Sequence, residues 1–300
     1  MSKDAEYNRE TFFPFSILEE VIAILKEKEC SFVTYADFNL NLIHPRLDRL
    51  SYLFEFVNFN LSDSNKVAKT AILSKFLLEK ILVRKKLFKF LTQANNRIGP
   101  VVVLQHDADQ QPYKTVDMMN YEKSLGVISS SYFFKKQNFD PEKTYKLDVE
   151  ELRALEDQGF EIGYHLNAYE LAEYDLKRAK EIIKDDLAYF EENFNLRTFV
   201  PHGGHPSTDG LNNDNLAYEG LLRKYSWCYN GLGFCQNESW SDGNIYFEDI
   251  EDPRKVAARL TKGQRGMFLM HPQYYGNQLS PEYHRLPVSK EKWWKELWCI

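Results

Sequence analysis

The stretch VVVLQHDAD (residues 101–109) joins a predicted buried strand to two carboxylates. Four consecutive apolar residues, 101–104, are typical of a parallel strand that is covered on both faces. Asp107 and Asp109 follow at positions i and i+2, which point to the same side of an extended chain. Carboxylates this close repel each other unless a proton or a cation separates them. The stretch predicts a strand that ends at a divalent metal, with one carboxylate left as a base. The alternative is a solvated Asp-x-Asp turn.

Strands and helices alternate on both sides of this stretch. The predicted strands are 31–35, 101–104, 129–134, 161–164, 198–201, 245–250 and 267–270. The predicted helices are 15–28, 114–124, 148–158, 176–193, 215–224 and 253–260. This alternation indicates a parallel α/β sheet, and about seven repeats favour a closed or nearly closed barrel over an open sheet. We predict one domain over residues 1–300, with an N-terminal helical elaboration that includes a helical insertion at about 63–95.

Composition and charge argue against several classes of protein. Hydrophobic residues make up 43 % of the chain, which is enough to bury a sizeable core. The net charge of −6 and the absence of an extended Lys/Arg block argue against a nucleic-acid partner. No run of 18 apolar residues occurs, so we expect no membrane span. The acidic, polar start and four cysteines without a CxxC pair predict a cytoplasmic protein with reduced thiols and no export signal.

Five of the seven histidines lie at or just past the end of a predicted strand: His106, His165, His202, His205 and His271. The carboxyl ends of parallel strands form the edge where catalytic side chains converge. Any one of these histidines could instead be a hydrogen-bonded core residue. Their agreement across four strand ends favours a site that gathers several imidazoles.

Two further features point to a substrate. Gly203 and Gly204 follow a strand, and glycines there let backbone N–H groups approach a ligand, as an oxyanion site requires. The alternative for them is a plain turn. Trp240 is a candidate for stacking on a sugar ring, and the alternative is that it packs in the core or a loop. The other candidates of this kind are Trp227, Tyr229, Tyr274 and Tyr275.

These motifs resemble those of the polysaccharide deacetylases, also known as the NodB-homology or carbohydrate esterase 4 family. Within it, the chain looks like a divergent branch associated with surface-polysaccharide biosynthesis. The similar segments are HDAD (106–109), SSYFF (130–134), GFEIGYH (159–165), PHGG (201–204) and LMHP (269–272). The resemblance covers about residues 100–275. It implies a distorted (β/α) barrel of about seven strands.

The resemblance also implies roles for individual residues. Asp107 would be the catalytic base and His271 the general acid, while Asp109 and His165 would hold a divalent metal, which we expect to be Zn²⁺. The chain departs from the family at Tyr169, where a second metal-binding histidine is usual, and at Val200, where an arginine normally orients the base. The third ligand is therefore open.

Several groups are candidates for the third ligand. We take His202 as this ligand; Asn167, Tyr169, Glu170 or water are the alternatives, and His202 is also the candidate to replace the arginine. We assign substrate or oxyanion contacts to six residues: His106, Asn167, Tyr169, Gly203, Gly204 and Trp240.

The function that follows is metal-dependent hydrolysis of an acetyl group, N-acetyl rather than O-acetyl, from a sugar. The expected substrate is an acetylated sugar, a nucleotide-sugar or a lipid-linked glycan precursor. Two alternatives remain. One is a catalytically degenerate, glycan-binding barrel. The other is a different metal hydrolase, such as a phosphoesterase or amidohydrolase, although these usually carry more His and carboxylate ligands.

Overall fold

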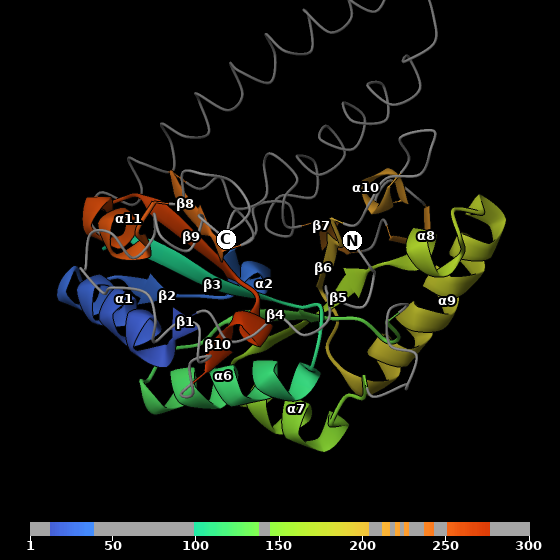
Figure 1. Ribbon diagram of the computed structural model, residues 1–300, viewed down its shortest axis with the longest axis horizontal. Helices are drawn as coiled ribbons and strands as arrows, with labels where there is room; N and C mark the ends of the chain where they lie inside the picture. The colour runs from blue at the N-terminus through green and yellow to red at the C-terminus, as the bar shows by residue number, and fades with distance from the viewer. Residues whose placement is uncertain are drawn as a thin grey trace, which may run out of the picture. The chain divides into compact units, whose positions relative to one another are not determined.

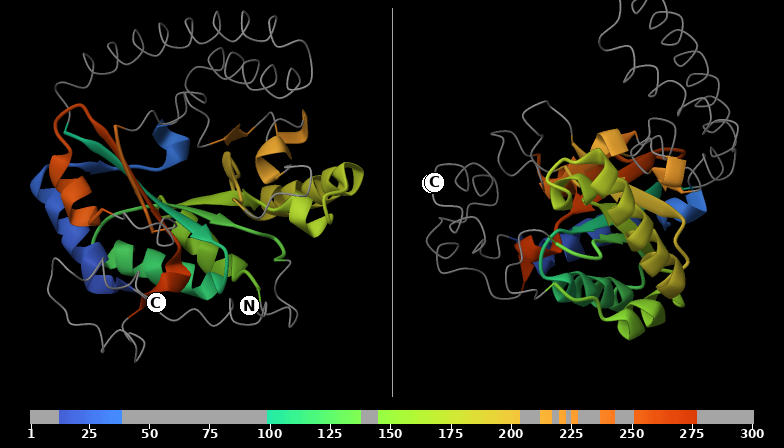
Figure 2. Two further views of the ribbon diagram at one scale, coloured as in Figure 1. Left: turned by 45° about the horizontal axis from the view of Figure 1, so that its top comes forward. Right: turned by 90° about the vertical axis from the view of Figure 1, so that its right-hand side faces the viewer.

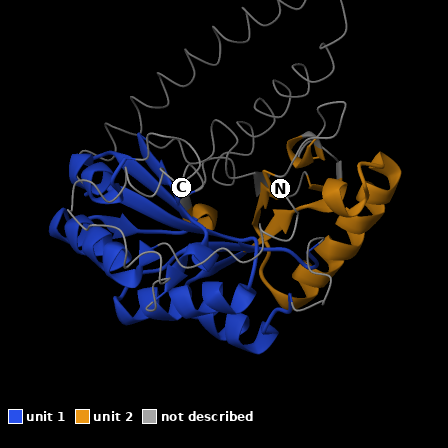
Figure 3. Cartoon of the chain, in the orientation of Figure 1, with its two compact units in different colours: residues 1–34, 99–162, 236–300 blue, residues 35–98, 163–235 orange. Residues whose placement is uncertain are grey.

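The computed structural model describes residues 13–38, 99–137, 145–203, 212–216, 220–222, 225–227, 237–242 and 251–276 (Figure 1). The chain divides into two compact units (Figure 3). Unit 1 comprises residues 1–34, 99–162 and 236–300, and unit 2 comprises residues 35–98 and 163–235. None of the helices within the described ranges has the length and apolar character needed to cross a membrane.

Strand β3 (Val101–Ala108) is the centre of the sheet in unit 1, and all eight of its residues are buried. Its parallel neighbours are β2 (Ser31–Phe32), β4 (Ser130–Phe133) and β9 (Arg265–Met270). β8 (Glu238–Ser241) pairs in parallel with β9 and extends the sheet. A strand with neighbours on both edges and cover on both faces requires the continuous apolar run that the sequence shows at 101–104.

The register of β3 leaves its carboxyl end only partly paired. On one edge, β9 pairs with residues 101–106 of β3. On the other edge, β2 pairs with residues 101–102 and β4 with residues 105–108. Gln105 and His106 are therefore held from both edges, whereas Asp107 lies beyond the last pair with β9. Asp107 is thus paired on one edge, with Tyr132 of β4, and Asp109 follows the last residue of the strand.

The core of unit 1 lies between the sheet and two helices, α1 (Phe15–Glu27) and α11 (Pro253–Arg259). The buried residues of α1 recur at helical spacing, which confirms the predicted amphipathic helix. They are Ile17, Leu18, Val21, Ile22 and Leu25. α11 begins with proline, and the side chain of Asp252 caps its first turn by accepting from the backbone N–H of Arg254. α1 and α11 lie side by side (Figures 1 and 2).

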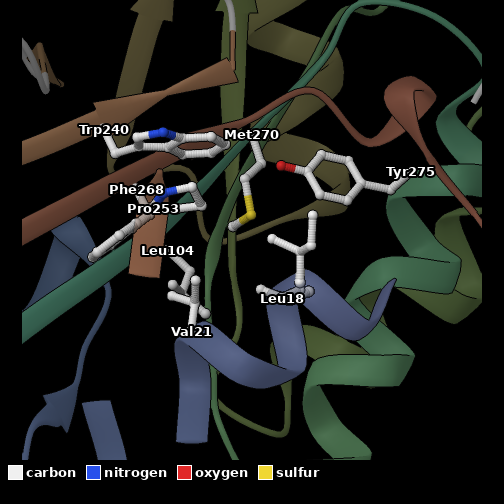
Figure 4. Close-up of a pocket in the computed structure, with 9 residues that line it drawn as sticks. Leu18, Val21, Leu104, Trp240, Pro253, Phe268, Met270 and Tyr275 are labelled. Carbon is white, nitrogen blue, oxygen red and sulfur yellow. The ribbon is translucent and has the colours of Figure 1, made fainter. Parts of the chain in front are cut away.

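A small void of about 10 Å³ lies in this core (Figure 4). It is lined by Ile17, Leu18, Val21, Leu104, Trp240, Pro253, Phe268, Met270 and Tyr275. This volume is about that of one water probe and the lining is mostly apolar, so the void is a packing gap rather than a ligand site.

A second, two-stranded sheet joins distant parts of unit 1. β1 (Phe13–Pro14) pairs in parallel with β10 (Tyr275–Gly276). The ring of Phe13 stacks on Tyr275, with ring centroids 5.1 Å apart, and meets Trp240 edge-on at 6.3 Å. The remaining long helices of unit 1 are α6 (Pro112–Ser124) and α7 (Val149–Glu156), and a 3-10 helix, η4, spans Pro272–Tyr274.

In unit 2, the parallel strand order is β5-β6-β7. β5 (Glu161–Leu166) begins in unit 1, at residues 161–162, and continues into unit 2. The other strands are β6 (Thr198–Pro201) and β7 (Ser226–Trp227). The helices are α2 (Tyr35–Phe38), α8 (Ala168–Leu171), α9 (Leu176–Asn193), α10 (Asn213–Leu216) and the 3-10 helix η2 (Gly220–Leu222).

The predicted fold class is confirmed: the strands pair in parallel and alternate with helices, as in a distorted (β/α) barrel of about seven strands. A continuous helix over 215–224 is wrong, because α10 ends at Leu216 and a 3-10 turn follows at 220–222. The predicted strand 245–250 and the helical insertion at about 63–95 lie outside the described residues. The extent of a single domain over 1–300 stays a prediction.

Candidate active site

Asp107 and Asp109 lie at the carboxyl end of β3, at the boundary between core and solvent. Asp107 is 6 % exposed, and the side chain of Asp109 is 21 % exposed. Gln105 shares one side of the strand with Asp107, because the two residues are two positions apart. The amide Nε2 of Gln105 donates a 2.8 Å hydrogen bond to Oδ1 of Asp107. The first carboxylate is thus fixed by its own strand.

His271 follows the last residue of β9 and is held by a carboxylate from the next strand along the sheet. Asp242, the residue after β8, is fully buried, and its Oδ1 lies 2.5 Å from Nδ1 of His271. Its Oδ2 accepts the backbone N–H of His271 at 2.7 Å. This two-point contact fixes both the backbone and the ring, so that Nε2 faces away from Asp242.

Nε2 of His271 lies 3.5 Å from Oδ2 of Asp109, so the imidazole bridges two carboxylates. Burial alone lowers the pKa of His271, but the negative charges of Asp242, Asp109 and Asp107 outweigh it and raise the pKa to about 10. His271 therefore carries its proton at neutral pH. A protonated imidazole that is oriented by a buried carboxylate can act as a general acid.

Tyr275 is a second hydrogen-bond partner of Asp242. Burial is the main cause that raises the pKa of Tyr275 well above 10, followed by the charge of Asp242, the hydrogen bond to Asp242 and the charge of Glu122. The hydroxyl therefore stays protonated and donates to Asp242. Asp242 accepts from the backbone and ring of His271 and from this hydroxyl, which offsets the cost of burying its charge.

The backbone beyond β3 is braced by two side chains. The hydroxyl of Tyr145 donates to the carbonyl of Ala108 at 2.7 Å and accepts from the N–H of Phe134 at 3.1 Å. Nε2 of Gln137 donates to the carbonyl of Asp109 at 2.5 Å. These contacts replace the ladder hydrogen bonds that the strand lacks at its end, so the carboxylates stand on fixed backbone.

His106 faces the opposite side of β3 from Asp107. Its Nδ1 lies 3.0 Å from Oγ of Ser131, its Nε2 lies 3.0 Å from Oε1 of Glu122, and the residue is fully buried. Both ring nitrogens are engaged inside the protein. This geometry favours the core histidine that the sequence left open as an alternative, rather than the substrate contact that we assigned to it.

In unit 2, the structure brings His165 and His202 together. Nδ1 of His165, in β5, donates to the carbonyl of Val200 at 2.9 Å. Nδ1 of His202, just after β6, lies 2.9 Å from Oε1 of Glu170. The two rings meet edge to face, with centroids 5.3 Å apart. Because a carbonyl and a carboxylate only accept, each Nδ1 carries the proton, and in the neutral rings each Nε2 carries the lone pair.

Glu170 is the centre of a hydrogen-bond network that fixes His202. Its side chain is 5 % exposed. Nδ2 of Asn213 donates to Oε1 of Glu170 at 2.9 Å and to the carbonyl of His202 at 3.1 Å. Oδ1 of Asn213 accepts from the backbone N–H of Tyr169 at 3.1 Å. Metal-binding histidines generally donate their second ring nitrogen to a carboxylate or carbonyl in this way.

The remaining predicted residues have mixed placements. Asn167 is buried at the start of α8, and Tyr169 is buried within this helix. Gly203 is exposed, and a Cβ there would meet no described atom within 4 Å. Gly204 lies outside the described residues. Trp240 is 5 % exposed in the core, and its indole N–H donates to the carbonyl of Glu251 at 2.7 Å. This favours core packing over sugar stacking.

Two residues in these networks received no such role from the sequence. Asp242 is the partner of His271, and its position directly after the Ser239-Trp240-Ser241 segment of a strand is the only local signal for it. Glu170 was considered as a ligand, whereas its carboxylate hydrogen-bonds to the ring of His202.

The predicted site residues thus form two groups, each inside one unit. Asp107, Asp109 and His271 gather in unit 1, and His165 and His202 gather in unit 2. Within the described ranges, no cluster of three or more His, Cys, Asp or Glu side chains is arranged to hold a metal ion. The meeting of the two groups stays a prediction.

Comparison with known proteins adds little. No family model matches the chain, and no curated protein matches it. A solved structure of a CE4 esterase from Streptococcus mutans is similar at 15 % sequence identity, with a TM-score of 0.37, over 60 % of this chain and 77 % of that one. A likeness this low identifies neither family nor function.

Proposed function

We propose that this protein is a metal-dependent hydrolase that removes an acetyl group from a sugar. The observation that carries this proposal is the arrangement in unit 1, where His271 bridges Asp242 and Asp109. A protonated imidazole fixed beside a carboxylate pair supplies an acid and a base within one group of residues. Asp107 is the base in this scheme, and His271 is the acid.

The chemistry of the donor set fits a divalent metal such as Zn²⁺. His165 and His202 both use Nδ1 to donate, so in each neutral ring Nε2 carries the lone pair through which an imidazole would bind a metal. We assign Asp109, His165 and His202 as the ligands, with His202 in place of the histidine that Tyr169 replaces. When bound, such a metal would lower the pKa of a coordinated water and polarise a carbonyl.

The residues of the chain supply the other steps. Asp107, whose carboxylate accepts a hydrogen bond from Gln105, accepts the proton of the attacking water. The backbone N–H of Gly203 stabilises the negative charge that develops on the acetyl oxygen, an effect of about 3–4 kcal/mol for a well-placed donor. His271 gives its proton to the leaving nitrogen or oxygen, and Asp242 keeps the ring oriented during that transfer. The reaction class is acyl transfer to water.

The proposed substrate is an acetylated sugar, either a nucleotide-sugar or a lipid-linked glycan precursor, and N-acetyl is preferred to O-acetyl. The test is acetate release from an N-acetylated nucleotide-sugar, an N-acetylated oligosaccharide and an O-acetylated sugar, with protein loaded with Zn²⁺ or Co²⁺. Release from the N-acetylated substrates, at a higher rate than from the O-acetylated one, is expected.

Substitutions of the two aspartates distinguish the catalytic base from the metal ligand. Asp107→Asn should lose about 10²–10⁴-fold in kcat and keep its metal, because a general base is worth that much. Asp109→Asn should lose the metal as well. Asp117→Asn, an exposed carboxylate on α6, is the matched control and should behave as wild type. Saturable glycan binding without metal or acetate release would instead identify a glycan-binding barrel and overturn the proposal.

A further inference from the structure

The resemblance to the polysaccharide deacetylases implies an arginine that orients the base, and Val200 stands at that position in this chain. Val200 is fully buried in β6, and its carbonyl accepts the Nδ1–H of His165. The position therefore has a different task here. Asp107 is contacted by the side-chain amide of Gln105, whose Nε2 donates to its Oδ1 at 2.8 Å.

We infer that Gln105 is the positioning residue for the base Asp107, in the role that an arginine would otherwise fill. This inference rests on the proposed function. Gln105 is fully buried and acts through Asp107 rather than on the substrate. Its amide donates to Oδ1 of the carboxylate, and in the proposed reaction the second oxygen, Oδ2, accepts the proton from water.

The strand register shows why Gln105 is suited to this role. Gln105 pairs with Ser130 of β4 on one edge and with Leu269 of β9 on the other. Asp107 pairs with Tyr132 of β4 but lies past the last pair with β9. The backbone of Gln105 is therefore paired on both edges of β3, whereas the backbone of Asp107 is paired on one edge only. A side chain on the part of the strand that is paired on both edges can fix the orientation of a side chain on the part that is paired on one edge.

The geometry also sets the length of the side chain. Residues i and i+2 of a strand point the same way and are about 6.6–6.8 Å apart along it. A glutamine spans this distance to a neighbouring aspartate, whereas asparagine is shorter by one methylene. A glutamate has the reach but presents oxygens in place of the donor. Length and donor character can thus be varied separately at this position.

The experiment compares Gln105→Met, Gln105→Asn and Gln105→Glu with wild type, with Thr115→Val as the control. Thr115 is fully buried in α6 of the same unit, and its hydroxyl has no hydrogen-bond partner among the described residues. Each protein is measured for kcat, KM, metal content and melting temperature. Crystal structures of wild type and Gln105→Met give the orientation of the Asp107 carboxylate.

All three variants should lose about 10- to 100-fold in kcat, because displacing a reacting group by about 1 Å costs that much. KM and metal content should stay unchanged, and Gln105→Glu should be the slowest because its charge repels Asp107. Thr115→Val should keep the wild-type kcat. A role in stability alone would lower the melting temperature and leave kcat per folded molecule intact, which would overturn the inference.

The result also separates this inference from the proposed function. If wild type releases acetate and Gln105→Met is equally fast, the inference fails and the function stands. If wild type releases no acetate from any substrate, the function fails, and the crystal structures decide about Gln105. An Asp107 carboxylate with the same single orientation in wild type and Gln105→Met would then overturn the positioning role.

Discussion

The charge on His271 can be tested by replacing its buried partner, in metal-free protein, with Asp242→Asn. In wild type, three carboxylates raise the pKa of His271 from 6.5 to about 10. A raised histidine pKa means that the folded state holds its proton more tightly than the unfolded state. The stabilisation is therefore fully present below pH 6.5, the ordinary value, and is lost as the pH rises through about 10.

The size of the effect follows from the shift. A change of 10 − 6.5 = 3.5 pKa units corresponds to about 5 kcal/mol at 1.36 kcal/mol per unit. About 4 kcal/mol of this is lost between pH 6.5 and pH 10, since the remainder lies in the tails of the two titrations. In Asp242→Asn, the largest raising cause is gone while burial still lowers the pKa, so most of this pH dependence should disappear.

Two measurements check this. NMR of ¹³C-histidine-labelled protein in a chelator should show His271 protonated up to about pH 10 in wild type and deprotonated near neutral pH in Asp242→Asn. Chemical denaturation at several pH values should show the difference in the free energy of unfolding. Asp186→Asn is the control, because this carboxylate is equally buried but accepts from the hydroxyl of Tyr164 instead of a histidine. An imidazole that titrates near pH 6.5 in wild type would show that these carboxylates do not hold the proton on His271.

Two other predictions follow from the hydrogen-bond networks. Glu170→Gln should weaken metal binding about 10- to 100-fold, as measured by competition with a chelating dye, because it weakens the hold on His202. Glu173→Gln, an exposed carboxylate, should leave the affinity unchanged, and equal affinities for both variants would contradict a role for Glu170. Glu122→Leu should lower the free energy of unfolding by about 3–5 kcal/mol, because it leaves the fully buried ring of His106 without this partner. A loss below about 1 kcal/mol in chemical denaturation would count against a structural pair.

Local sequence patterns were sufficient for the elements that are long or uniformly apolar. The apolar run of β3 and the helical spacing in α1 predict both elements because burial dictates their composition. β7 and β8 escaped prediction because strands of two and four residues carry too little pattern. The helix predicted at 215–224 shows the same limit, since tertiary contacts rather than propensity decide where a short helix ends.

For the site, the sequence predicts which residues stand at strand ends but not their partners. Asp242 and His271 are 29 positions apart, and only the parallel pairing of β8 with β9 places them in contact. The orientation of His106, in contrast, is predictable from the alternation of side chains along a strand. Since Asp107 and Asp109 share one side of an extended chain, the residue before Asp107 must face the other side.

The stacking of Phe13 on Tyr275 has a practical consequence for anyone who prepares this protein. Tyr275 supports Asp242, which in turn orients His271, so a ring contributed at residue 13 buttresses a proton donor 258 positions later. A truncation that begins at residue 15 would delete that buttress. Expression plasmids should keep Phe13 and Pro14, and an affinity tag belongs well upstream of them.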